Sequence, residues 1–81
     1  MEVRYDCPNG PCPSLARLVE LAEKDDFVGV LRELKTRGRE TEPERLRGEV
    51  WVAWTGHYGN HLVDVLVWEN KVELVIACPE A

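Results

Sequence analysis

The spacing of apolar residues differs between the two halves of this 81-residue chain, and that difference limits the folds the chain can adopt. Between residues 13 and 37, apolar side chains recur every three or four residues, which places them on one face of an α-helix. From residue 49 onward the pattern has a period of two, as in β-strands. The sequence therefore predicts an α+β fold, with helices before a sheet.

The first half of the chain is predicted to form two helices joined by a short connection. The first helix covers about 13–24, with Cys12 or Ser14 as its cap. The second begins after Asp26, whose carboxylate can cap it, and should stop at Gly38. Because the connection is so short, we expect an antiparallel helical hairpin whose apolar stripes both need a surface to cover.

The strands come before and after this hairpin. Residues 2–6 alternate as a short strand, and a Pro- and Gly-rich turn follows at 7–11. The polar stretch 38–47, with a proline near its middle, is interpreted as a connector. Three antiparallel strands are predicted after it, at Glu49–Thr55, Leu62–Trp68 and Val72–Cys78. The order is β-α-α-β-β-β, a helical hairpin packed on an antiparallel sheet, in a single domain over 1–81.

Both faces of the predicted sheet carry apolar residues. On the first of the three strands, Val50, Val52 and Trp54 are predicted to share one face. The middle strand sets one apolar row against another, Val63, Val65 and Val67 against Leu62, Leu66 and Trp68, with Asp64 among the second row. Two short helices can cover only one side of such a sheet, so we expect the other side to bind a second copy of the chain or a protein partner.

Composition and charge exclude several classes of protein. The chain is 44% hydrophobic and 31% charged, which is typical of a folded soluble domain, and no apolar run approaches the length of a membrane span. Its net charge of −5 argues against a general nucleic-acid coat protein. The first residues do not resemble a signal peptide, so we expect a cytoplasmic protein. The absence of Gln and the abundance of Glu and Arg favour a thermophilic source.

The three cysteines allow several interpretations. Cytoplasmic thiols are normally reduced, although hyperthermophiles keep intracellular disulfides, and an odd number leaves at least one cysteine free. Cys7 and Cys12 either form a disulfide across the turn or, with His57 and His61, supply four ligands for tetrahedral zinc. Cys78 is interpreted as a small buried apolar side chain. No cofactor other than this zinc ion is expected.

The element order, together with Leu-Arg-Gly-Glu-Val-Trp at residues 46–51, resembles the RelE/ParE superfamily of toxins, especially its HigB-like members. The resemblance implies a toxin–antitoxin protein with ribosome-linked mRNA cleavage and an antitoxin-like partner. Two basic positions of that family are Trp54 and Asp64 here, and residues 48–81 hold five acidic residues and one basic residue. The alternative is therefore a degenerate, non-catalytic relative that binds a protein partner or forms a homodimer through the apolar sheet face.

If the chain cleaves RNA, His57 and His61 are the candidate acid and base, since histidine alone has an unperturbed pKa near neutrality. Arg45 and Arg47 are the candidate contacts to RNA phosphates. The competing interpretation places both histidines, without a chemical role, in an exposed hairpin loop over 56–61.

A second resemblance concerns Cys12. The pattern of Asp6, Gly10, Cys12 and Pro13 is similar to the start of TusA/SirA-type sulfur carriers, which implies that Cys12 carries a persulfide. A thiol at a helix N-terminus has its thiolate favoured by the helix dipole, which suits this role. That family runs β-α-β-α-β-β, so it requires a strand at 27–34 and a helix at 50–54. The two families therefore demand opposite secondary structure in the same region.

Overall fold

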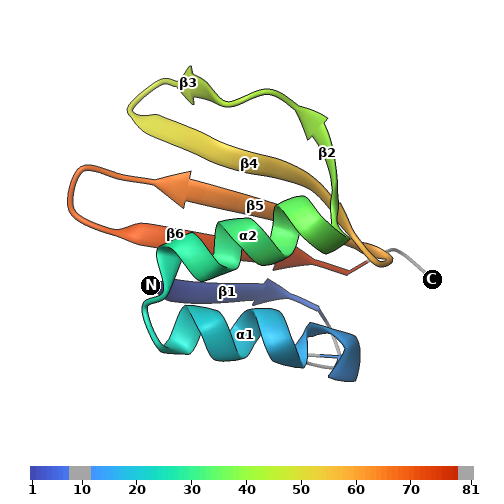
Figure 1. Ribbon diagram of the computed structural model, residues 1–81. Helices are drawn as coiled ribbons and strands as arrows, with labels where there is room; N and C mark the ends of the chain where they lie inside the picture. The colour runs from blue at the N-terminus through green and yellow to red at the C-terminus, as the bar shows by residue number, and fades with distance from the viewer. Residues whose placement is uncertain (8–11, 79–81) are drawn as a thin grey trace.

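A computed structural model describes residues 1–7 and 12–78, in which two helices lie against one face of a six-stranded sheet (Figure 1). The elements are, in chain order, β1 (Glu2–Asp6), a 3-10 turn η1 (Pro13–Leu15), α1 (Ala16–Glu23), α2 (Phe27–Arg37), β2 (Arg39–Glu42), β3 (Arg45–Arg47), β4 (Val50–Tyr58), β5 (His61–Val67) and β6 (Val72–Ala77). The predicted α+β class and the order of a strand, a helical hairpin and a meander are confirmed. Most of the predicted turn at 7–11 lies outside the described residues.

The two helices begin and end where the sequence predicts. Asp26 caps α2, because its carboxylate accepts a hydrogen bond from the backbone N–H of Gly29 at 2.9 Å. At the other end the N–H of Gly38 donates to the carbonyl of Leu34 at 2.7 Å. A helix therefore covers the segment where a sulfur carrier would have a strand, and β4 covers the segment where it would have a helix.

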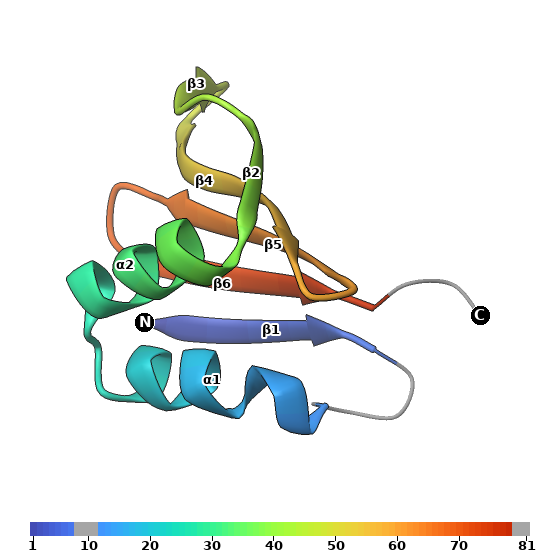
Figure 2. The same cartoon turned by 45° about the vertical axis from the view of Figure 1, so that its right-hand side comes forward.

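The sheet has the strand order β1-β6-β5-β4-β2, and β3 also pairs with β4. The first and last strands, β1 and β6, are neighbours and run parallel, whereas all other pairs are antiparallel. Figures 1 and 2 show α1 lying along β1 and α2 crossing β5 and β6 on the same side. Joining the two ends of the chain in this way brings residues that are far apart in the sequence to one edge of the molecule.

The prediction of a connector at 38–47 is wrong. Most of these residues form two short strands, β2 and β3, which pair with β4 in an antiparallel direction. They supply hydrogen-bond partners for the outer edge of β4, which would otherwise present unpaired backbone groups. Because their side chains are mainly exposed, the strands show no alternation of apolar and polar residues in the sequence.

The alternation predicted along β4 is interrupted. A bulge separates Val52, which pairs with Leu66, from Trp54, which pairs with Val65. Since Leu66 and Val65 point to opposite faces of β5, Val52 and Trp54 also lie on opposite faces. The prediction that Val50, Val52 and Trp54 share a face is therefore wrong, and the bulge turns Trp54 into the core beneath the helices.

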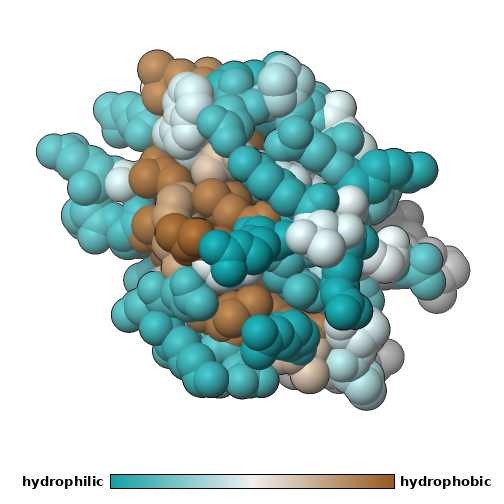
Figure 3. Space-filling model, viewed as in Figure 1, coloured by the Kyte–Doolittle hydropathy of each residue, from teal (hydrophilic) through white to brown (hydrophobic). Residues whose placement is uncertain are grey.

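The core lies between the helices and the sheet. It contains apolar side chains of η1, α1, α2 and the three long strands, the largest of which are Trp54, Leu15, Leu18, Leu34, Leu74 and Ile76. Figure 3, which has the same view as Figure 1, shows apolar surface as a band between the helices and β3. The right-hand side of the molecule in this view is hydrophilic. Leu46 and Trp51, which face each other across β3 and β4, are 66% and 40% exposed.

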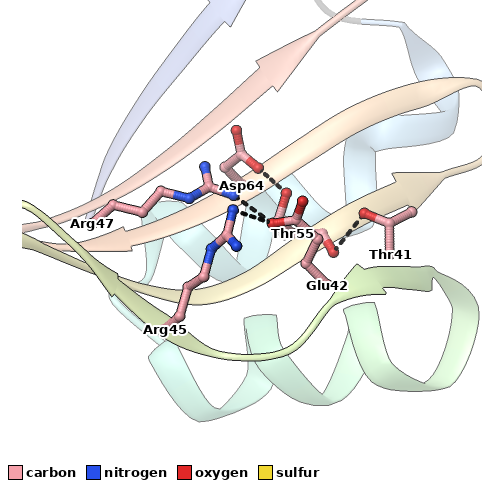
Figure 4. A network of polar contacts seen from close by, with 6 residues as sticks. All are labelled: Thr41, Glu42, Arg45, Arg47, Thr55 and Asp64. Carbon is pink, nitrogen blue, oxygen red and sulfur yellow. Dashed lines mark hydrogen bonds and ion pairs between the residues drawn. The ribbon is translucent and has the colours of Figure 1, made fainter.

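The uncovered face of the sheet is mixed in character rather than apolar. The Thr55 hydroxyl donates to the carboxylate of Asp64, and Glu42 is paired with Arg45 and Arg47 (Figure 4). Each guanidinium lies 2.7 Å from the same Glu42 oxygen. These polar groups lie on the face for which the sequence predicted an apolar row with Asp64 among its residues.

Candidate functional site

The hairpin between β4 and β5 holds both candidate catalytic histidines, but it points them to opposite faces of the sheet. The predicted loop at 56–61 is wrong: β4 continues to Tyr58, and the turn is only Gly59 and Asn60, with Gly59 at a φ of 61°. His61 pairs with Tyr58 on the side of the helices. His57 pairs with the exposed Leu62 on the other side. A site on one face of the sheet therefore contains one of the two imidazoles.

His57 lies at a cavity of about 610 Å³ between the end of α2 and the β4–β5 turn. Its lining residues are Arg37, Gly38, Arg39, His57, Gly59 and Asn60. Arg39 is the residue opposite His57 in the pairing of β2 with β4. The two arginines can bind an anion such as phosphate, and the imidazole beside them can accept or donate a proton.

The predicted phosphate ligands Arg45 and Arg47 lie elsewhere. Both arginines are on β3, where they pair with Val52 and Val50 of β4. His57 is five residues beyond Val52 along β4, a distance of about 16 Å at roughly 3.3 Å per residue. Both are also engaged by Glu42. The structure instead places Arg37 and Arg39 beside His57. The sequence could not predict this arrangement, because it depends on the pairing of β2 with β4.

Arg37 is positioned by a buried polar contact between α2 and β4. The Tyr58 hydroxyl donates to Glu33 at 2.6 Å, and the same Glu33 oxygen lies 3.6 Å from Nε of Arg37. Burial, together with the hydrogen bond and the negative charge of Glu33, raises the pKa of Tyr58 to about 12. The neutral phenol therefore donates a hydrogen bond to Glu33, and Glu33 in turn forms an ion pair with Arg37 at the edge of the cavity.

We expect Tyr58→Phe to lower the free energy of unfolding by about 2 kcal/mol at neutral pH, because it removes a hydrogen bond to a carboxylate. With its raised pKa, folded Tyr58 keeps its proton between pH 10 and 12, whereas the unfolded chain loses it. Tyr58 therefore contributes its full stability below pH 10, and this is lost as the pH rises through 12. Denaturant unfolding of both proteins should show a difference that shrinks in this range. A difference that is constant with pH would contradict the assignment.

A second group of functional side chains gathers where β1, β5 and β6 meet the start of η1. Cys7 and Cys78 form a disulfide with a Cα–Cα distance of 5.1 Å, because they follow the last residues of the parallel pair β1 and β6. The predicted disulfide between Cys7 and Cys12 is therefore wrong, as is the interpretation of Cys78 as an apolar filler. Cys12 is the free cysteine, as the odd number requires.

Cys12, His61 and Cys78 each place a donor atom within 4.8 Å of the other two. His61 is 6% exposed, and within the described part of the chain its Nδ1 atom is buried without a hydrogen-bond partner. Cys12 is half-buried and lines a cavity of about 490 Å³ together with Tyr5 and Glu23, which gives small molecules a route to the cluster. A buried imidazole beside thiol sulfur is the donor set that zinc prefers.

Of the four predicted metal ligands, the structure brings Cys12 and His61 together and places Cys7 in the disulfide beside them. His57 is not part of the group, because it faces the other side of β4. The residue that the sequence did not point to is Cys78. Its only signal was its position at the end of the last predicted strand, Val72–Cys78, which is close to the position of Cys7 after the first.

Neither helix of the described chain is long and apolar enough to cross a membrane. Comparisons with protein-family models, curated proteins and solved structures found no match for this chain.

Proposed function

We propose that the chain is a small toxin-like protein that cleaves mRNA at the ribosome, with the His57 cavity as its active site. The observation that carries the proposal is that His57, Arg37 and Arg39 line one cavity. The element order agrees with the plan on which the resemblance to RelE/ParE toxins rests. In this role His57 accepts the proton of a ribose 2′-hydroxyl while the arginines stabilise the charge that develops on the phosphate.

The local charge supports this site in spite of the acidic chain as a whole. Arg39 is exposed and forms no ion pair with any residue described in the structure, so its guanidinium is available to a phosphate. Arg37 pairs with Glu33 at 3.6 Å, but its side chain is 73% exposed and lines the cavity. RNA bound here would contact Arg37 at the end of α2 and Arg39 at the start of β2.

The test is a cell-free translation reaction to which purified protein is added, with mRNA ends mapped by primer extension. We expect cleavage that falls at least about 100-fold in His57→Ala, because general acid–base catalysis contributes on that order. Arg39→Ala should also lose cleavage.

Arg45→Ala is the matched control, since it removes an arginine that lies away from the cavity and should leave cleavage unchanged. Intact mRNA in the presence or absence of ribosomes would contradict catalysis and favour a non-catalytic relative that binds a protein partner. Equal cleavage by the parent and His57→Ala would remove His57 from the site.

A second function, that of a small zinc-stabilised binding domain, is favoured by the cluster of Cys12, His61 and Cys78. In the reduced chain we assign these three residues and Cys7 as the ligands of one zinc ion. Zinc–sulfur bonds of about 2.3 Å place tetrahedral donors about 3.7 Å apart, so Cys12, His61 and Cys78 would move slightly inward from the observed limit of 4.8 Å. The sulfurs of Cys7 and Cys78 would move apart once their disulfide is reduced. Coordination would also give the buried His61 nitrogen the partner that it lacks.

Cobalt(II) titration of the reduced protein tests this zinc site. We expect one equivalent to bind with the visible absorption of a tetrahedral centre and with thiolate-to-cobalt charge-transfer bands. Cys12→Ser should weaken both bands, whereas His57→Ala should leave them unchanged, because His57 faces the other side of β4. Reduced protein that shows only octahedral cobalt would contradict the site.

A further inference from the structure

The cysteine cluster consists of Cys7, Cys12 and Cys78 with His61 beside them. Each sulfur in it can bind zinc or belong to a disulfide, but it cannot do both at once. A thiolate binds zinc, whereas a sulfur in a disulfide has given up that charge to a covalent bond. Cys7 and Cys78 are joined in the structure, and Cys12 is free. We propose, on the basis of the zinc site assigned above, that this cluster is a redox switch in which the Cys7–Cys78 disulfide and a zinc ion are alternative states.

The position of His61 supports two states rather than a permanent disulfide. A disulfide stabilises the junction of β1 and β6 without help from an imidazole. His61 is nevertheless 94% buried beside it, with Nδ1 unpartnered in the described chain. Buried nitrogens are nearly always hydrogen-bonded or metal-bound, and this imidazole lies beside the sulfurs of Cys12 and Cys78, so it is a candidate partner for a metal ion. Reduction of the neighbouring disulfide creates the thiolates that such an ion needs.

The oxidation step is balanced with a hydroperoxide as the two-electron oxidant. The thiolate of Cys78 attacks the peroxide oxygen, which breaks the O–O bond and leaves a sulfenic acid on Cys78 and a hydroxide that takes up a proton. The thiolate of Cys7 then attacks this sulfur and expels hydroxide, which leaves as a second water. Zinc keeps its charge but loses two ligands. All three cysteines are half-buried, so a small oxidant can reach them.

The switch would act on the start of the helical hairpin rather than on the sheet. In the zinc state Cys12 is bound through the metal to His61 at the start of β5 and to the ends of β1 and β6. In the oxidised state β1 and β6 remain joined through Cys7 and Cys78, but Cys12 has no bond to the sheet. The Cys12 side chain forms no capping hydrogen bond, so among the described residues η1 is then joined to the sheet by packing contacts. Its local stability should therefore depend on the redox state.

The experiment starts from the reduced chain loaded with one equivalent of zinc. Hydrogen peroxide is added, released zinc is measured with a chromogenic chelator, and disulfides are located by peptide mass mapping. We expect one zinc ion released for each Cys7–Cys78 disulfide formed, and renewed zinc binding after dithiothreitol is added. Hydrogen exchange at residues 12–16 should become faster on oxidation, with little change in β4. The His57→Ala variant should behave as the parent does.

Two results would overturn the inference and are distinguishable. If the reduced chain binds no zinc, the zinc site itself is wrong and the switch fails with it. If zinc binds but stays bound after the Cys7–Cys78 disulfide has formed, the zinc site stands and only the switch is wrong. The variant Cys12→Ser separates the states further, because it should form the disulfide normally while binding zinc several-fold more weakly.

Discussion

Reduction of the Cys7–Cys78 disulfide in the presence of a metal chelator is expected to lower the free energy of unfolding by about 4 kcal/mol. The reason is the length of the loop that it closes: the two cysteines are 71 residues apart, so the bond restricts nearly the whole unfolded chain. It also anchors β1, which pairs with only one strand, β6. A domain of this size has a total stability of roughly 4–12 kcal/mol, so the loss is a large part of it.

Denaturant unfolding with and without a phosphine reductant measures this effect, and two serine variants control it. Cys78→Ser should have the stability of the reduced parent and should not respond to reductant. Cys12→Ser should respond as the parent does, because Cys12 is outside the bond. A parent protein whose midpoint is the same in both conditions would show that the disulfide contributes nothing to the folded state.

Replacement of Trp54 by alanine is expected to cost about 3–5 kcal/mol of stability, because it empties the largest site in the core. Trp54 is 1% exposed, and the bulge in β4 directs its ring toward the end of α2. There the ring lies so close to Gly38 that a Cβ atom on that glycine would be 2.9 Å from it. The indole therefore joins the helix end to the sheet through direct packing.

Two aromatic variants make this prediction specific. Trp54→Phe should cost less than Trp54→Ala, since it fills most of the space and removes an indole N–H that has no partner among the described residues. Trp51→Ala changes the same type of residue at a position that is 40% exposed and should cost less, about 2 kcal/mol. Equal losses for Trp51→Ala and Trp54→Ala, measured by denaturant unfolding, would contradict the assignment of the core.

The helices and the three long strands could be predicted because each follows from neighbouring residues. The apolar spacing, the carboxylate of Asp26 and the glycine at 38 all act within a turn or two of chain. The strands β2 and β3 could not be predicted in this way. Their side chains are polar and exposed, so their only reason to be extended is the backbone edge of β4, to which they bind.

In the candidate sites, too, the residue types could be predicted from the sequence, whereas their arrangement in space could not. His57, His61, Cys7 and Cys12 were recognised by their chemistry, but the sequence grouped them incorrectly. The alternation of side chains along β4 and β5 sends the two histidines to opposite faces. Arg37 and Arg39 replace Arg45 and Arg47 beside His57 because of the register between β2 and β4.

The sequence by itself determined the two helices, β1 and the three long strands, the order of these elements, and which residues carry reactive groups. These properties depend on residues within a few positions of one another. Only the tertiary structure decided that β1 lies parallel to β6, and with it that Cys7 meets Cys78 and that both lie beside Cys12 and His61. Such contacts join residues up to 71 positions apart, and the pairing of strands that creates them leaves no local pattern in the chain.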